Sequence, residues 1–258
     1  MINESAISVN NISFSYEKKR IYDDLSVDFP LNKISFLMGV NGCGKTTLLK
    51  IICNFLIVEH GDIRVLGKSL SEYNSKSLSR AIAYVPQIIN LNNDFLVKDY
   101  LAMGRSPYLE FGSSPSKEDF LKVEEYAKVF DILDLLDTNF SSLSGGQKQI
   151  VAITRAMIQE TPIIIMDEPM SALDMGKQAD LLSLLLEMQK KGKTIMLTSH
   201  NPNHALAIKD FCNVCLIHNH NILGQGECSS VLTKENVSIM FGNKVSLDEN
   251  NSNLKFTL

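Results

Sequence analysis

The sequence predicts an α/β fold built around a parallel sheet. Three apolar stretches, Lys33 to Met38, Ile163 to Met166 and Thr194 to Thr198, have the length and composition of buried strands. A helical pattern from Lys45 to Phe55 follows the first stretch, and another from Lys177 to Lys191 separates the last two. Strands that alternate with helices are typical of βαβ units, whose crossovers make neighbouring strands parallel.

The segments around these units add further strands near the N-terminus. Ile7 to Phe14 and Leu25 to Phe29 alternate or cluster apolar residues as strands do. Asp62 to Leu66 and Ala81 to Val85 are shorter stretches of the same kind. We therefore expect the chain up to about residue 87 to contribute several strands to the core.

The pattern changes between Ile88 and Gln159. This stretch has little strand signal, and Lys117 to Leu136 places apolar residues three or four positions apart, as one face of a helix requires. The residues in question are Phe120, Val123, Ala127 and Phe130. We expect residues 88–159 to form a helical subdomain inserted into a core of residues 1–87 and 160–241.

The C-terminal part continues the core and then loses its pattern. Val214 to His218 and Ile222 to Gly224 flank a short polar turn and predict a hairpin. From Gly242 the chain is rich in Asn and Ser, which predicts a loosely held tail. The expected organisation is a single domain of residues 1–241 followed by a tail of residues 242–258.

Composition and charge exclude several classes of protein. The 258 residues are 45% hydrophobic and 21% charged, and the net charge of -4 lacks the basic surface that nucleic acid attracts. No charged-then-apolar leader is visible, and no apolar run reaches the roughly 18 residues that span a bilayer. The five cysteines have no disulfide-framework spacing. These features predict a cytoplasmic protein without a nucleic-acid partner.

The first chemical motif runs from Gly39 to Thr46, between a predicted strand and a predicted helix. Its sequence, Gly-Val-Asn-Gly-Cys-Gly-Lys-Thr, is the phosphate-loop pattern. Glycines allow positive-φ turns and let backbone N–H groups approach phosphate oxygens closely. Lys45 would supply a cation to the β and γ phosphates, and the Thr46 hydroxyl would ligate Mg2+. The motif therefore predicts a nucleotide site.

Asp167 and Glu168 directly follow the apolar strand that ends at Met166. A strand in a parallel sheet delivers its carboxyl end to the ligand crevice, so both carboxylates should lie near the phosphate loop. Asp167 would hold Mg2+ directly or through water, and Glu168 would take a proton from the attacking water. An exposed acidic turn before Pro169 is the alternative interpretation.

Ser144, Gly145, Gly146 and Gln147 open a second helical run. Serine is a favoured N-cap, and glycines let N–H groups face an anion, so this helix start can itself bind phosphate. A capped helix without a ligand is the alternative. Two phosphate cradles in one chain exceed what one ATP needs, which suggests that two copies clamp nucleotide between them.

With these residues, the chain resembles the ATP-binding cassette family, the motor subunits of ABC transporters. Residues 143–147 read Leu-Ser-Gly-Gly-Gln, the signature motif of that family, and the resemblance spans about Ile7 to Phe241. It implies a P-loop NTPase core with a mixed sheet, an antiparallel β subdomain and an inserted helical subdomain. It also implies ATP and Mg2+ as cofactors and the hydrolysis of ATP to ADP and phosphate.

The resemblance assigns roles to residues that no local pattern marks. Tyr16 matches the aromatic residue that stacks on adenine, and Gln87 matches the glutamine that senses Mg2+ and water. Asp174 ends the loop that signals across the dimer, and His200 matches the switch histidine at the γ-phosphate. The plain alternatives are a strand-end tyrosine, a surface glutamine, a helix cap and a loop histidine.

The implied mechanism is an ATP sandwich in a homodimer, in which the phosphate loop of one copy and the Ser144 helix start of the other close on one γ-phosphate. The nucleotide-binding set is Tyr16, Gly39, Asn41, Gly42, Cys43, Gly44, Lys45, Thr46, Thr47, Gln87, Ser144, Gly145, Gly146, Gln147 and Asp174. The catalytic set is Lys45, Gln87, Glu168 and His200, and the metal set is Thr46, Gln87 and Asp167.

The cargo and the membrane partner follow from a further likeness. Met103 to Tyr108 looks like the ATPases of importers for iron-siderophore, haem and cobalamin, a subfamily that includes molybdate and related oxyanion importers. Such a subunit binds a permease dimer at the cytoplasmic face of the membrane, here through residues 88–108, and acts with a periplasmic or extracellular substrate-binding protein. Zinc or manganese importers, a soluble cassette ATPase outside transport and a non-hydrolysing module are the alternatives.

Cysteines and histidines give two smaller hypotheses. Cys212, Cys215, His218 and His220 are soft ligands at short spacing, but Cys215 and His218 should face opposite sides of a strand, so we expect buried cysteines rather than a zinc site. Cys43 lies beside a helix N-terminus, which tends to lower a thiol pKa. We expect alkylation of Cys43 to block activity and Mg-ATP to slow it, with an inert side chain as the alternative.

Overall fold

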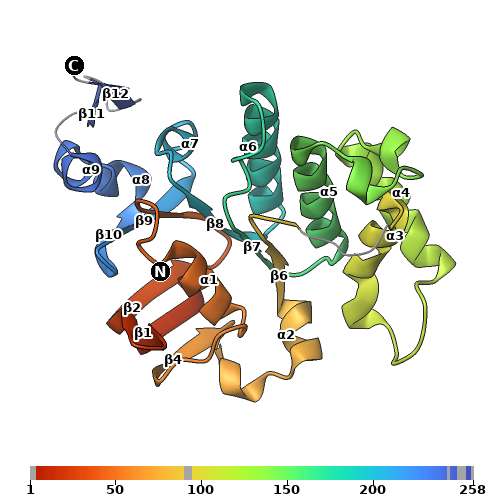
Figure 1. The fold of residues 1–258 in the computed structure, drawn as a ribbon, viewed down its shortest axis with the longest axis horizontal. Coiled ribbons are helices and arrows are strands. Elements are labelled where there is room, and N and C mark those ends of the chain that lie inside the picture. Colours follow the sequence, from red (N-terminus) through yellow and green to blue (C-terminus); the bar gives the residue numbers. More distant parts are fainter. Residues whose placement is uncertain (1–3, 90–94, 243–244, 249–253, 257–258) are drawn as a thin grey trace.

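The computed structural model describes residues 4–89, 95–242, 245–248 and 254–256 (Figure 1). At its centre lies a six-stranded mixed sheet in the order β10-β9-β3-β8-β7-β6. Its strands are β3 (Ile34–Met38), β6 (Ile82–Val85), β7 (Ile163–Met166), β8 (Thr194–Ser199), β9 (Cys212–His218) and β10 (Asn221–Glu227). The pairs among β6, β7, β8, β3 and β9 are parallel, and β10 returns antiparallel to β9 as the predicted hairpin.

The parallel strands are paired so that their carboxyl ends reach one edge of the sheet together. Met38 of β3 lies opposite Ser199 of β8. Met166 of β7 lies opposite Leu197 of β8, and Val85 of β6 lies opposite Met166. Each of these strands leads directly into a loop that carries a predicted site residue. The register therefore brings these loops to the same edge, where ligands of open α/β sheets bind.

One face of this sheet is covered by a second sheet and by helix α1 (Lys45–Ile52). The second sheet is antiparallel and has the order β2-β1-β4-β5. Its strands are β1 (Ser5–Tyr16), β2 (Lys19–Pro30), β4 (His60–Val65) and β5 (Lys68–Ser69). Leu37, Ile165 and Met196 of the central strands share a buried cluster with Leu48 of α1 and with residues of this sheet. The expected antiparallel β subdomain is confirmed.

The opposite face of the central sheet is covered by helices, as Figure 1 shows for α5, α6 and α7. Phe36, Ile164 and Leu197, which alternate with the residues of the first cluster, pack with these helices in another buried cluster. The helices are α5 (Gly145–Ile158), α6 (Met175–Lys190), α7 (Asn203–Leu206), α8 (Cys228–Val231) and α9 (Lys234–Phe241). Because both faces are covered, β3 and β7 are buried at every position.

The inserted region is helical, as the sequence predicts. Its elements before α5 are α3 (Val97–Ala102), the 3-10 helix η2 (Met103–Tyr108), α4 (Lys117–Val129) and two further 3-10 turns, η3 (Leu133–Leu135) and η4 (Phe140–Ser142). They enclose a core of their own around Val97, Val123 and Phe140, to which α5 contributes Val151. None of the described helices is both long enough and apolar enough to cross a membrane.

Helix α4 ends earlier than its apolar spacing predicts. The pattern extends to Leu136, but the helix stops at Val129. Asp131 has φ of 52°, a left-handed conformation that Asp tolerates and that a continuing helix does not allow. The apolar residues beyond this point fall in the short turn η3 instead.

Helix α2 (Ser75–Ala81) was not predicted, because its serine-rich sequence lacks an apolar stripe. Its start is fixed by a capping box. The Asn74 carboxamide oxygen accepts the Ser77 N–H at 2.8 Å, and the Ser77 hydroxyl accepts the Asn74 N–H at 3.0 Å. Capping of this kind satisfies N–H groups that a short helix leaves without partners.

The expectation of a loosely held tail is wrong for the tail residues that the structure describes. Strand β11 (Val245–Leu247) pairs with β12 (Leu254–Phe256). Leu247 is buried in the cluster between the central sheet and the helices that cover it. The Leu254 N–H donates to the Asn203 carboxamide oxygen at 2.9 Å. A few apolar residues among many polar ones are enough to hold a hairpin once a hydrophobic surface is nearby.

Candidate active site

The loop Gly39–Thr46 connects β3 to α1 at the carboxyl edge of the central sheet. Gly42 and Gly44 have φ of 82° and 111°, values that side chains rarely adopt. Gly39 is required by space: a Cβ there would lie 2.4 Å from the Cys43 sulfur and 2.5 Å from the Ile217 carbonyl oxygen. The loop is thus folded against β9 with its glycines where only glycine fits.

Lys45, the first residue of α1, is tied to this loop. Its ammonium donates to the carbonyl oxygens of Gly39 at 2.8 Å and Val40 at 3.2 Å, and the residue is only 6% exposed. Carbonyl dipoles replace the water that a buried cation loses. The positive charge therefore sits at the loop in a prepared position.

Tyr22 supports the loop from below and was missed by the sequence analysis. Its hydroxyl donates to the Gly44 carbonyl oxygen at 2.8 Å, and the residue is fully buried. Burial raises the pKa of Tyr22, so the hydroxyl stays protonated and keeps donating. A Cβ at Gly44 would lie 2.4 Å from the Tyr22 hydroxyl oxygen, which makes the glycine and the tyrosine a matched pair.

The premise that the helix N-terminus lowers the pKa of the Cys43 thiol is contradicted, while the effect of alkylation stays a prediction. Cys43 is only 4% exposed and belongs to the cluster beneath the loop. Burial raises the pKa of the Cys43 thiol, and the nearby Lys45 ammonium opposes that rise only in part. Desolvation outweighs the helix N-terminus here, because the sulfur points toward Gly39 and away from solvent.

A hydrogen bond between Asp167, which follows β7, and Thr198 of β8 links the two strands at the same edge. Asp167 is 1% exposed, and one carboxylate oxygen accepts the Thr198 hydroxyl at 2.6 Å. The same hydroxyl oxygen accepts the Glu168 N–H at 2.7 Å. Thr198 therefore fixes both acidic residues, although the sequence analysis gave it no role. A threonine near the carboxyl end of a buried strand was the signal available for it.

Glu168, Gln87 and His200 meet beside Asp167. The His200 Nδ1 atom lies 3.0 Å from a Glu168 carboxylate oxygen, and the Gln87 amide nitrogen lies 3.5 Å from the same oxygen. Glu168 has φ of 45°, a left-handed conformation in which a non-glycine residue is strained. In this conformation its side chain reaches Gln87 beyond the end of β6 and His200 beyond the end of β8. The three predicted residues come from three separate strands of one sheet.

The helix start at Ser144 is capped by its own residues. The Ser144 hydroxyl accepts the Gln147 N–H at 3.3 Å, and the Gln147 carboxamide oxygen accepts the Ser144 N–H at 2.9 Å. Gly146 approaches the loop before α6 closely, since a Cβ there would lie 3.1 Å from the Ala172 carbonyl oxygen. Asp174 ends that loop and caps α6 by accepting the Lys177 N–H at 2.9 Å.

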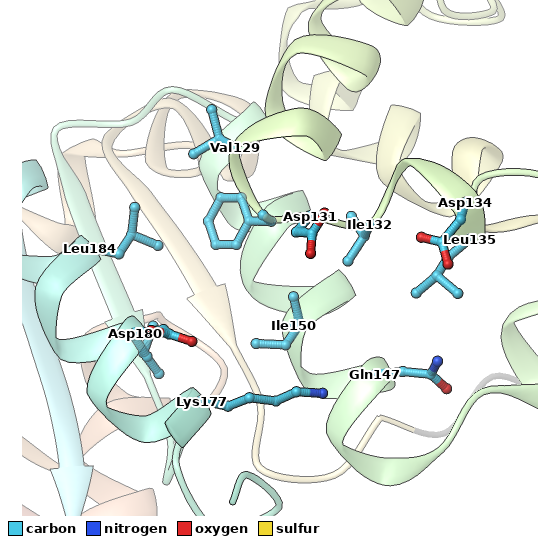
Figure 2. Close-up of a pocket in the computed structure, with 12 residues that line it drawn as sticks. Val129, Asp131, Ile132, Asp134, Leu135, Gln147, Ile150, Lys177, Asp180 and Leu184 are labelled. Carbon is cyan, nitrogen blue, oxygen red and sulfur yellow. The ribbon is translucent and has the colours of Figure 1, made fainter. Parts of the chain in front are cut away.

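A groove of about 380 Å³ lies beside this helix start, between α4, α5 and α6. Figure 2 shows Gln147 and Lys177 along one end of the groove and Ile150, Leu184 and Val129 within it. The groove therefore borders the Ser144 helix start but lies away from Glu168 and Gln87. It separates the helical insertion from the core along α6.

The two predicted phosphate cradles precede helices that pack on opposite faces of the central sheet. Helix α1, which follows the first cradle, packs on the face covered by the antiparallel sheet. Helix α5, which follows the second, packs on the other face, and the two helices lie apart in Figure 1. Tyr16, at the end of β1, is 42% exposed and packs edge-on against Phe14 with ring centroids 4.9 Å apart.

The donors near the first cradle fit Mg2+. Asp167 provides a carboxylate, Thr46 a hydroxyl and Gln87 a carboxamide oxygen, the hard oxygen ligands that Mg2+ prefers together with water and phosphate. Gln87 turns its amide nitrogen toward Glu168, which leaves its oxygen for another partner. In the part of the chain that the structure describes, no three His, Cys, Asp or Glu side chains gather as they would around zinc.

This fold and this arrangement of loops define an ATP-binding cassette. The family model for ABC transporters matches residues 22–171, and the chain belongs to that family. It is an ATPase subunit that binds and hydrolyses ATP, and subunits of this family work with membrane permease components.

Known relatives span nearly the whole chain. An uncharacterised ABC transporter ATP-binding protein of Haemophilus influenzae is 35% identical over 235 residues, which cover 91% of this chain and 89% of that protein. A protein of Helicobacter pylori named as a probable iron chelatin transport ATP-binding protein is 31% identical, covering 91% of this chain and 92% of its own. A solved ABC transporter of the metal-chelate type, in an inward-facing conformation, matches with a TM-score of 0.81 at 30% identity, over 98% of this chain and 97% of that one.

The hydrogen bond between Thr198 and Asp167 can be tested by Thr198→Val. The change keeps the shape of the side chain but leaves a buried carboxylate oxygen and the Glu168 N–H without this partner. We expect the free energy of unfolding in urea to fall by about 2 kcal/mol. Thr194→Val is the matched control in the same strand, because its hydroxyl accepts the N–H of the exposed residue Asn32 rather than donating to a buried carboxylate. Equal losses in both variants would contradict the importance of the Asp167 contact.

Proposed function

We propose that this ATPase closes on ATP as a homodimer and drives the uptake of a metal chelate through a separate membrane permease. The observation that carries the proposal is the meeting of Glu168, Gln87 and His200 at the sheet edge that also carries the phosphate loop. Phosphoryl transfer needs positioned charge rather than covalent chemistry, and this edge supplies a cation, a base and several oxygen ligands.

The phosphate loop would bind the triphosphate through its backbone N–H groups and Lys45. Residues 39–47 contribute N–H groups at the start of α1, where the helix dipole also favours an anion. The Lys45 ammonium would exchange its bonds to the Gly39 and Val40 carbonyl oxygens for bonds to the β and γ phosphates. Tyr16, exposed at the end of β1, would stack on the adenine.

Glu168 would act as the general base and His200 would contact the γ-phosphate. The Glu168 carboxylate is held by Gln87 and His200 at the strand ends, and it would there accept a proton from the attacking water. The His200 side chain is 54% exposed, so it can leave Glu168 for a phosphate oxygen. Thr46, Asp167 and Gln87 would hold Mg2+, which would neutralise phosphate charge when bound.

Two copies would complete each site. Within one chain the Ser144 helix start belongs to the face of the sheet opposite the phosphate-loop helix, so a second copy is the natural source of the opposing cradle. Ser144 to Gln147 of one copy would then meet the γ-phosphate held by the other. Asp174, beside that helix start, would carry the state of one site to the other.

The permease would dock on the helical insertion, which we take as residues 88–159 within a core of residues 1–87 and 160–241. Arg105 anchors the predicted docking stretch by pairing with Asp119 at 3.0 Å and Glu160 at 3.0 Å. Tyr108 donates to the Gln159 carbonyl oxygen at 2.9 Å. These contacts join the stretch to the end of α5, so movement at the permease would reach the Ser144 helix start through one rigid helix.

The cargo we favour is an iron chelate. Relatives named for iron chelatin and siderophore transport, and the metal-chelate type neighbour, support this class. Other relatives of similar identity are named for molybdate, manganese and zinc, and these cargoes are the alternatives. The subunit would work at the cytoplasmic face of the membrane, with a periplasmic or extracellular binding protein delivering the cargo.

Glu168→Gln tests the base and the dimer together. The amide keeps the shape and hydrogen bonding of the side chain but cannot accept a proton from water, so we expect kcat to fall by at least about a hundredfold while ATP still binds. The trapped protein should run as a dimer in Mg-ATP by size-exclusion chromatography with light scattering. Glu187→Gln, on the exposed side of α6, should behave like the unaltered protein. Normal turnover by Glu168→Gln would refute the base assignment.

Uptake assays test the cargo. Cells that express this subunit with its permease and binding protein should accumulate labelled iron-siderophore, and the Glu168→Gln subunit should abolish that uptake. Molybdate, manganese and zinc are supplied to the same cells as competing cargoes. Uptake of one of these instead, with no uptake of the chelate, would overturn the cargo proposal while leaving the ATPase assignment intact.

A further inference from the structure

A second histidine, His204, lies behind the catalytic residues and has no role in the mechanism so far. It belongs to α7 and is only partly exposed. Together with Gln178 of α6 and Ser199 of β8 it lines a cavity of about 130 Å³ that also reaches Glu168 and His200. These residues link the strand that ends at His200 with the loop that follows Glu168.

The hydrogen bonds in this cavity have a fixed direction. The Gln178 amide nitrogen donates to the carbonyl oxygens of Met170 at 3.1 Å and Leu173 at 3.0 Å. Both of its N–H groups are therefore used, and its carboxamide oxygen is left as an acceptor. That oxygen lies 3.3 Å from His204 Nε2, so Nε2 carries the proton. The other ring nitrogen, Nδ1, is then unprotonated and can only accept. The Ser199 hydroxyl therefore donates to it at 3.0 Å rather than to the Asn201 carbonyl oxygen at 3.2 Å.

This direction requires a neutral His204. Burial, and after it the nearby His200, lower the pKa of His204. A protonated ring would carry a second N–H at Nδ1, which would reverse this hydrogen bond and redirect the Ser199 hydroxyl to the Asn201 carbonyl oxygen. The surroundings therefore keep the ring in the form that the hydrogen bonds need.

We propose that Ser199, His204 and Gln178 form a positioning relay that holds the loop from Met170 to Leu173 in register with the end of β8. The loop leads to Asp174, and its residue Ala172 contacts Gly146 at the start of α5. The relay thereby ties the position of His200 to the helix start that we assign to the opposite nucleotide. It rests on the proposed roles of His200 and of this loop, and it names the side chains through which the two act together.

The relay acts through other residues and touches no nucleotide. Its loss should therefore lower kcat more than it raises the KM for ATP, because the phosphate loop and Tyr16 remain unchanged. If these residues only fill space, their loss should lower stability, lower kcat and raise KM together. The two interpretations can be separated by a spectroscopic measurement and a kinetic one.

The spectroscopic test is the 15N NMR spectrum of the histidine rings in the full chain near pH 7.5. His204 is identified by the signals that disappear in His204→Gln. We expect the tautomer protonated at Nε2, and we expect Gln178→Leu, which removes the acceptor, to abolish that preference. A ring protonated at Nδ1 in the unaltered protein would overturn the relay, whatever the ATPase assays show.

The kinetic test compares single and double variants. Gln178→Leu and His204→Leu should each lower kcat about tenfold and change KM less than about twofold, and the double variant should be no slower than either. His204→Gln keeps a donor and an acceptor and should retain most of the activity. The matched control is Gln189→Leu, near the end of the same helix, which should leave kcat unchanged.

Additive losses in the double variant, or unchanged kcat in Gln178→Leu, would contradict the relay. Thermal melting of each variant shows whether it is folded, and the spectrum of the unaltered protein tests the geometry even if a leucine variant fails to fold. His200→Ala distinguishes a failure of the proposed role of His200 from a failure of the relay. Full turnover in that variant would remove the role of His200, while the tautomer of His204 would still report whether the relay exists.

Discussion

The site depends on the hydrogen-bonded register of the parallel strands β3, β8, β7 and β6. Each of these strands ends in a residue that leads directly to a functional loop, and the main-chain ladders set how far apart those loops lie. A slip of one residue would turn the side chains of a strand to the other face. In β8 such a slip would remove Thr198 from Asp167 and would bury different residues against both layers. The core and the site are therefore specified by the same set of backbone bonds.

The layered arrangement has a second effect on how the cassette works. The phosphate-loop helix and the Ser144 helix are supported by different hydrophobic clusters on opposite sides of one sheet. Helix α5 also contributes Val151 to the core of the helical insertion, so it belongs to both units. A rotation of the insertion would move the Ser144 helix start while the phosphate loop stays fixed to the central sheet. Under the proposed function, α5 would therefore be the element through which a membrane partner acts on the Ser144 helix start.

The sequence was sufficient where the chemistry is encoded locally. The glycine pattern of residues 39–46, the apolar strand before Asp167 and the Ser144 cap each lie within a few residues, and the fold and family they predicted are confirmed. Tyr22 and Thr198 were missed because their importance comes from contacts with Gly44 and Asp167, which pairing of distant segments creates. The premise of a lowered Cys43 pKa was wrong for a related reason. A local rule about helix N-termini was outweighed by burial against Gly39, and only the packed structure shows on which side of the loop the sulfur lies.

The bonds between the Lys45 ammonium and its own loop determine what it costs to bury this charge and to bind a ligand to it. A cation this deeply enclosed would destabilise the chain if it had no acceptor, and the Gly39 and Val40 carbonyl oxygens provide one. The loop therefore accommodates the buried charge through its own main chain. A triphosphate bound as proposed would compete with these two partners, so its net gain at this lysine would be smaller than the contact alone suggests. Release of product would be eased by the same exchange, because the departing phosphate would leave behind a charge that the loop accommodates.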